Sequence, residues 1–160
     1  MTDTPMTEVG VVAADHPSLD DQVAMFVDTV RDEPRYFGPT ARRNPKPFPS
    51  LLSRLQQRGG FRLAAMDDGH IVGLVRVDDD GCVHIAVAAS HRGQGTGTML
   101  LSAATARAAH LQFGRLVLHS TRRSRAVRRL GERLGCTTID LGGGRVDVIL
   151  PVPTRAVLPA

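Results

Sequence analysis

The sequence is poor in aromatic residues, with no tryptophan, one tyrosine and five phenylalanines among 160 residues. Proteins that hold single-stranded nucleic acid stack its bases on aromatic side chains, so we expect no nucleic-acid partner. No apolar run approaches the roughly 20 residues of a membrane-spanning helix, so we expect no membrane partner. The polar, acidic N-terminus is not typical of a secretory signal peptide, and we therefore expect a cytoplasmic protein.

Cysteine is equally scarce. The two cysteines, Cys82 and Cys136, stand in apolar contexts and lack metal-ligand spacing. This pattern predicts two free thiols in a reducing compartment and no metal site. A chain of this length is expected to form one domain with one core. We assign residues 1–150 to that domain and residues 151–160 to a loosely held tail that contains prolines.

The net charge of +4 is distributed unevenly along the chain. Residues 1–33 hold eight acidic residues and one arginine, whereas residues 107–133 hold eight arginines and one glutamate. A basic C-terminal half suits a polyanionic ligand. A solvated basic face would have the same composition, so charge alone does not decide between the two.

Hydrophobic periodicity and turn residues predict a mixed α/β chain. Ser18 is a suitable N-cap for a first helix, which should stop before Pro34. Asp-Gly pairs between alternating apolar runs predict tight hairpins, and hence an antiparallel meander of three strands. In chain order we expect strand 9–13, helix 18–33, proline-rich loop 34–49, helix 49–58, strands 61–66, 71–77 and 82–87, glycine-rich turn 90–98, helix 99–113, strand 115–119, helix 124–134, and strands 137–141 and 145–150.

The glycine-rich turn joins a predicted strand to a predicted helix. Glycine permits positive φ and lets a ligand approach the backbone closely. The first amides of a helix have no internal partners and lie at the positive end of the helix dipole. The turn therefore predicts a site for a ligand that carries phosphate.

Several kinds of phosphate loop are compatible with glycine-rich turns. A Walker A loop requires a lysine where this chain has Thr98, directly after Gly97. A dinucleotide fingerprint requires a parallel strand-helix-strand unit and a third glycine one residue later than Gly97. A turn without a ligand explains poorly why three glycines and Arg92 gather at a helix start.

Residues 92–97 read Arg-Gly-Gln-Gly-Thr-Gly, which matches the R/Q-x-x-G-x-G/A signature of the GNAT family of N-acetyltransferases. Residues 124–136 resemble that family's penultimate helix, N-x-x-A-x-x-L-Y-E-K-L-G-F, and the order of elements is similar over nearly the whole chain. The resemblance implies a central, mostly antiparallel twisted sheet of six to seven strands flanked by about four helices. It also implies a splay between the strand that ends at Val87 and the strand at residues 115–119.

The resemblance further implies a site for acetyl-CoA as cosubstrate. Backbone groups of residues 85–87 would hydrogen-bond the pantetheine arm, and amides of residues 92–98 would hold the pyrophosphate. Ser124 matches the family's asparagine, although it also suits an N-cap. From charge and position we add Arg122, Arg123 or Arg125 as partners of the 3′-phosphate. The expected cofactor-binding residues are Ile85, Ala86, Val87, Arg92, Gly93, Gln94, Gly95, Thr96, Gly97, Thr98 and Ser124.

The catalytic groups follow the family pattern less closely. The family commonly places a glutamate on or near the strand at residues 82–87, where this chain offers His84. We take His84 as the candidate base, with an ordinary residue of the sheet as the alternative. The usual tyrosine acid is replaced by Gly131, and Tyr36 lies far away in sequence. Cys82 shares the strand face of His84 and is expected in the core rather than as a nucleophile.

The acceptor is expected to be an amine, either a small molecule or a lysine of a protein. Residues 34–39 weakly resemble the corresponding loop of some bacterial protein-lysine acetyltransferases, and a packed proline loop explains them equally well. The acidic N-terminal region would attract a cationic amine. Three functions stay open: acetyl transfer by direct attack in a monomer or homodimer, an acyl-CoA-binding module with little turnover, and a Rossmann-type nucleotide binder.

Overall fold

The computed structural model describes residues 9–32, 53–57, 59–121 and 124–153. The predicted loop at residues 34–49, the two arginines at 122 and 123, and most of the predicted tail lie outside these ranges. Residues 53–56 are helical, within the helix predicted at 49–58. The other elements are β1 (Gly10–Ala13), η1 (Pro17–Leu19), α1 (Asp20–Asp32), β2 (Phe61–Asp67), β3 (His70–Val77), β4 (Val83–Val87), η2 (Ala89–His91), α4 (Thr96–His110), β5 (Arg115–Thr121), α5 (Arg125–Leu134), β6 (Thr137–Gly142) and β7 (Arg145–Pro151).

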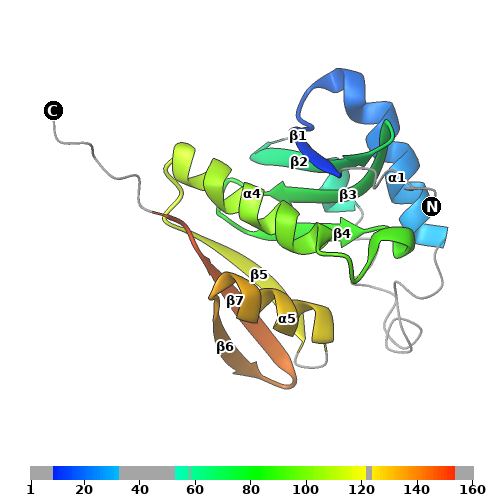
Figure 1. Ribbon diagram of the computed structural model, residues 1–160. Coiled ribbons are helices and arrows are strands. Elements are labelled where there is room, and N and C mark those ends of the chain that lie inside the picture. Colours follow the sequence, from blue (N-terminus) through cyan, green and yellow to red (C-terminus); the bar gives the residue numbers. More distant parts are fainter. Residues whose placement is uncertain (1–8, 33–52, 58, 122–123, 154–160) are drawn as a thin grey trace, which may run out of the picture.

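The strands form two antiparallel sheets (Figure 1). This arrangement confirms the predicted mixed α/β fold with mostly antiparallel strands. The first has the order β1-β2-β3-β4 and the second the order β5-β7-β6. Where β4 begins, Cys82 pairs with Val117 of β5 in an isolated parallel bridge. The Val117 amide donates there to the Gly81 carbonyl at 2.9 Å. Beyond this junction the two strands diverge, which confirms the predicted splay.

Two apolar clusters occupy opposite faces of the first sheet. One lies between α1 and the sheet and contains Val23, Phe26, Val27 and Val30, the predicted stripe of the first helix. The other lies under α4, where Leu100, Ala104 and Ala108 are buried as predicted, and continues into the second sheet. Leu111, predicted on the same face, is instead 49% exposed because α4 ends at His110.

The start of the first helix differs from the prediction. Ser18 does not cap α1, because Pro17 opens a 3₁₀ turn and α1 begins only at Asp20. His16 caps this turn instead, its Nδ1 accepting from the Ser18 amide at 3.1 Å. Proline favours the first position of a helix, where its missing amide costs nothing, so Pro17 rather than Ser18 determines where the turn starts.

A buried arginine joins three segments to the first sheet. Arg62 on β2 is 5% exposed. Its guanidinium donates to the carbonyls of Ala14 and Leu55 at 2.9 and 3.2 Å and to Asp20 Oδ1 at 3.1 Å. The end of β1, the helical residues 53–56 and the start of α1 are therefore held to β2 through a single side chain.

Gly81 is the residue that lets the two sheets meet. Its φ is +88°, and a Cβ there would lie 2.7 Å from the Arg115 carbonyl oxygen. Gly69, in the turn between β2 and β3, has a similar φ of +76° but no atom within 4 Å of such a Cβ. The two glycines therefore share a backbone conformation and differ in the space around them.

We predict that Gly81→Ala lowers the free energy of unfolding more than Gly69→Ala does. Both substitutions place alanine in the left-handed region, at about 1–2 kcal/mol. Gly81→Ala adds an overpacking cost of about 1–3 kcal/mol. Urea unfolding of the two variants beside the wild type measures the difference. Equal losses of unfolding free energy in the two variants would show that the backbone at Arg115 can shift at the junction without loss of stability.

Candidate functional site

A cleft of about 670 Å³ opens between β4 and β5, beyond the junction at Gly81. It is lined by β4, the turn that follows, the first residues of α4, residues 118–120 of β5 and one side of α5. The predicted cofactor-binding residues that line it are Ile85, Ala86, Val87, Arg92, Gly93, Gly95, Thr96, Gly97, Thr98 and Ser124. Gln94 is not among the lining residues, and its side-chain amide donates to the Ser90 carbonyl at 3.0 Å.

The first turn of α4 presents its amides at one end of this cleft. The helix begins at Thr96 rather than at residue 99, so the predicted start is wrong by three residues and Gly97 lies inside the helix. Gly95 is the N-cap, with φ +87°, and contributes no side-chain hydrogen bond; no acid occupies the first turn. Amides at such a helix start favour an anion. The earlier start moves this anion site into the glycine-rich turn itself.

Side chains before the helix fix the glycine-rich turn to the sheet. Arg92 Nε donates to the Val87 carbonyl at 3.0 Å, next to the end of β4. The His91 ring hydrogen-bonds Asp67 Oδ2 through Nε2 at 2.7 Å and Ser90 Oγ through Nδ1 at 2.7 Å. Asp67 ends β2, so this chain of contacts ties the turn to the hairpin between β2 and β3.

Helix α5 brings positive charge to the opposite wall. Arg129 and Arg133 line the cleft, whereas Arg125 is not among the lining residues. Ser124 is both a lining residue and the N-cap, because its Oγ accepts from the Val127 amide at 3.3 Å. The lining arginines are thus not the predicted Arg125 but residues one and two turns further along the same helix, and residues 122 and 123 lie outside the described ranges.

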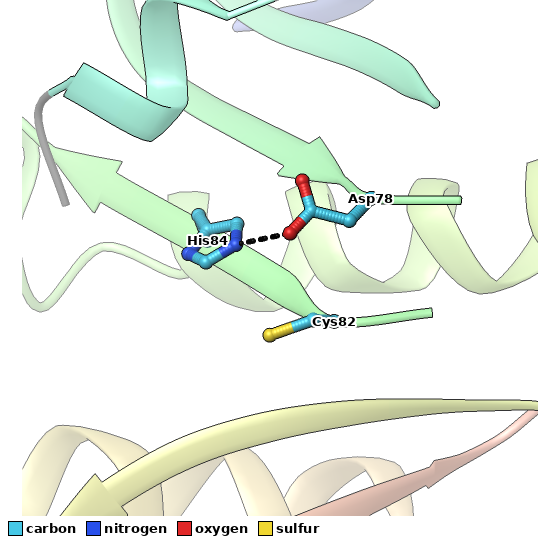
Figure 2. A group of neighbouring side chains, drawn as sticks. All are labelled: Asp78, Cys82 and His84. Atoms are coloured by element: carbon cyan, nitrogen blue, oxygen red, sulfur yellow. Dashed lines mark hydrogen bonds and ion pairs between the residues drawn. The ribbon is translucent and has the colours of Figure 1, made fainter. Parts of the chain in front are cut away.

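His84 lines the cleft and hydrogen-bonds a carboxylate that the sequence did not single out (Figure 2). Its Nε2 lies 2.9 Å from Asp78 Oδ2, and its side chain is 11% exposed. Arg76, the residue paired with His84 across β3 and β4, makes an ion pair with Asp78 Oδ1. Burial would raise the pKa of Asp78, but the hydrogen bond and charge of His84, together with Arg76, hold that pKa below its usual value. Asp78 is therefore the ionised partner of His84.

Cys82 lies beside this pair and is half-buried. Burial raises the pKa of its thiol, and the carboxylates of Asp78, Asp80 and Asp147 raise it further against the opposing effect of Arg54. A raised pKa disfavours the thiolate, which is the nucleophilic form. The expectation that Cys82 is not a nucleophile is consistent with this environment.

A second histidine lies on the facing strand. His119 of β5 lines the cleft, is 64% exposed at its side chain and contacts Asp147 Oδ1 through Nδ1 at 2.5 Å. We did not single it out from the sequence, although its strand borders the predicted splay. Gly131, which stands at the family's tyrosine position, is not among the lining residues, and Tyr36 lies outside the described ranges.

Residues 25–136 match the model of the acetyltransferase (GNAT) family. The chain belongs to this family. No curated protein matches the sequence. None of the helices in the described ranges is long and apolar enough to cross a membrane.

Solved structures of GNAT proteins share the fold at low identity. The GNAT domain of S. lividans PAT matches with a TM-score of 0.69 and 19% identity, over 89% of this chain and 90% of that domain. The Salmonella typhimurium protein yncA, solved with its cofactor acetyl-CoA, matches at 0.58 and 18%, over 95% and 98%. The ribosomal-protein-S18-alanine N-acetyltransferase of Escherichia coli matches at 0.60 and 16%, over 96% and 99%.

We predict that Asp67→Ala loosens the glycine-rich turn, because it removes the carboxylate that holds His91. Losing a partly buried hydrogen-bond partner costs about 1–3 kcal/mol. Amide hydrogen exchange at residues 89–95 should therefore become faster. Asp68→Ala is the matched control: it shortens the next aspartate, which is exposed in the same hairpin turn. Unchanged exchange in the Asp67 variant would mean that Arg92 alone fixes the turn.

Proposed function

We propose that this protein transfers the acetyl group of acetyl-CoA to an amine. The observation that carries the proposal is the cleft between two diverging strands, closed at one end by the uncapped start of α4. Such a cleft suits a long ligand with a pyrophosphate and an extended arm. Membership of the GNAT family supports the same reaction.

Each part of acetyl-CoA has a suitable partner along the cleft. Amides of residues 92–98 suit the pyrophosphate at the positive end of the helix dipole. Residues 85–87 of β4 line the cleft and suit the pantetheine arm, which would lie along this strand. Arg129 and Arg133 have the charge and position to meet the 3′-phosphate, with Ser124 between these two regions.

His84 is our proposed proton acceptor. The Asp78 carboxylate can only accept, so it favours the imidazole form that carries its proton on Nε2 and a lone pair on Nδ1. The neutral amine attacks the thioester carbonyl as its proton passes to His84. The tetrahedral oxyanion then collapses, the carbon–sulfur bond breaks and CoA leaves as a thiolate. A thiol with a pKa of about 8.5 leaves without strong acid assistance, so Gly131 in place of tyrosine is compatible with turnover.

The acceptor that we propose is a cationic amine, a small molecule or a protein lysine, in the cytoplasm. Its support is the excess of acidic residues among residues 1–33.

An acyl-CoA-binding module with little turnover is the second candidate, because the family's glutamate and tyrosine are both absent. Release of CoA thiol over a panel of amines separates the two functions.

We predict that Gly95→Trp abolishes acetyl-CoA binding in calorimetry, because the indole would fill the space in front of the helix amides. Gly143→Trp is the matched control: Gly143 also has positive φ and open space, but lies in the turn between β6 and β7. Both variants carry similar backbone strain, so thermal melting should change alike. Wild-type affinity in Gly95→Trp would place the ligand elsewhere.

We also predict that His84→Ala lowers kcat by about 10²–10⁴-fold, the usual contribution of a general base, while the Kd of acetyl-CoA changes little. His119→Ala provides the comparison, since it removes the other imidazole of the cleft. Steady-state kinetics and calorimetry on both variants measure the split. A larger loss of kcat in His119→Ala would assign the proton to the β5 histidine instead.

A further inference from the structure

Three potential metal ligands converge where β3 ends and β4 begins (Figure 2). One ligand atom each from Asp78, Cys82 and His84 lies within 4.8 Å of the other two. Zinc–sulfur and zinc–nitrogen distances of about 2.3 and 2.0 Å place the ligand atoms of a tetrahedral site roughly 3.3–3.6 Å apart. Side-chain adjustments of about 1 Å would therefore bring the three atoms onto one ion.

We propose that Asp78, Cys82 and His84 form a binding site for a zinc ion. A thiolate, an imidazole and a carboxylate are the donor types that zinc accepts, and three protein ligands leave a fourth position for water. Magnesium and calcium require oxygen ligands and do not suit a thiolate. The spacing of the cysteines predicted no metal site. The three ligands come together only because a reverse turn brings Asp78 back beside residues 82 and 84, which that spacing does not indicate.

The backbone holds the ligand set in place. The Asp78 amide donates to the Cys82 carbonyl at 2.9 Å, and the Cys82 amide donates to Asp80 Oδ1 at 3.0 Å. These two hydrogen bonds therefore close the turn. Arg76 binds Asp78 Oδ1, while Oδ2 contacts His84 Nε2 at 2.9 Å and Arg54 Nη1, from a half-exposed side chain, at 3.4 Å. This arrangement orients the carboxylate as outer-shell partners of metal ligands do.

The charges around the thiol favour a cation. The carboxylates of Asp78, Asp80 and Asp147 act on Cys82, with Arg54 as the opposing cation. A thiolate and the Asp78 carboxylate would together neutralise a divalent ion. Arg76 would then face a neutral site rather than a net positive charge.

A metal ion in this site would stop the reaction, a consequence that rests on the proposed function. Neutral imidazole carries one proton and one lone pair. If Nε2 binds the metal, the proton resides on Nδ1, and neither nitrogen can accept a proton from the amine. The site is therefore expected to be inhibitory.

Cobalt(II) titration of the untagged protein, with a phosphine as reductant, tests the site without an assay of activity. We expect a thiolate-to-cobalt charge-transfer band in the wild type and its displacement by zinc. Cys82→Ser should abolish the band and weaken zinc binding at least 10-fold, because losing even an outer-shell partner costs about 10–100-fold. Magnesium should give no heat in calorimetry.

Cys136→Ser is the matched control, since Cys136 is the other half-buried thiol, and its pKa is also raised by burial. It should keep the band. Absence of the band from the wild type, or its loss in Cys136→Ser rather than Cys82→Ser, would overturn the proposal. Far-ultraviolet circular dichroism checks that each variant is folded.

Inhibition is measured for each protein as the ratio of its initial rates with and without zinc. Saturating zinc should lower the initial rate of the wild type by about 100-fold or more, the usual contribution of a general base, and the zinc concentration that halves the rate should be at least 10-fold higher for Cys82→Ser. A cobalt band in a protein that transfers no acetyl group would contradict the proposed function and support the zinc site. Transfer that zinc does not affect, despite a cobalt band, would overturn the inhibitory role.

Discussion

The hydrogen bond from the Val117 amide to the Gly81 carbonyl is the contact on which the architecture depends. It pairs the two sheets where β4 begins, and β4 and β5 diverge from this point. The divergence opens the cleft that residues 83–87 of β4 line. A side chain at residue 81 would collide with Arg115, which explains why the junction requires glycine. The position of the cleft therefore follows from a steric condition at one residue.

A row of basic side chains crosses the first sheet close to the cleft. Arg62, Arg76 and His84 are consecutive cross-strand neighbours on β2, β3 and β4. Like charges directly opposite one another destabilise a sheet, and buried guanidiniums require partners. Asp20 and two backbone carbonyls bind Arg62, whereas Asp78 serves Arg76 and His84 and also contacts Arg54. The carboxylate that orients His84 in the cleft thus also compensates the buried Arg76.

Much of the fold could be read from the sequence because local rules decide it. The Asp-Gly turns, the α1 stripe and the alanine-rich face of α4 each follow from spacing and turn chemistry, and the structure confirms them. Element boundaries were less predictable: Pro17 delayed α1, and α4 began inside the glycine-rich turn. Buried Arg62 gave no signal, since its partners come from residues 14, 20 and 55.

The same distinction holds for the candidate site: features set by local sequence could be predicted, and those set by tertiary contacts could not. Residues 85–87 and 92–98 are close in sequence, and the signature at residues 92–97 with the strand before it was enough to predict them; all but Gln94 line the cleft. The groups around His84 could not, because Asp78 belongs to a run of three aspartates that looks like an ordinary turn. In the structure each aspartate has a different partner: Asp79 accepts from the Gly60 amide, Asp80 from the Cys82 amide, and Asp78 from side chains. Strand pairing assigns these roles, and pairing is a tertiary property.

Asp78 also determines which chemistry the cleft can support. With Oδ1 bound to Arg76, Oδ2 is the oxygen that contacts His84, and a metal ion there would replace this contact and the longer one to Arg54. The hydrogen bond to Nε2 and a metal bond to Nε2 exclude one another, because both use the same nitrogen. The proposed proton transfer and the proposed zinc binding would therefore be alternative states of one cluster, and Cys82 would distinguish them, since its sulfur would be needed for the metal and not for the proton. The carboxylates that raise the pKa of the Cys82 thiol disfavour nucleophilic catalysis, and the same negative charges would attract a divalent cation.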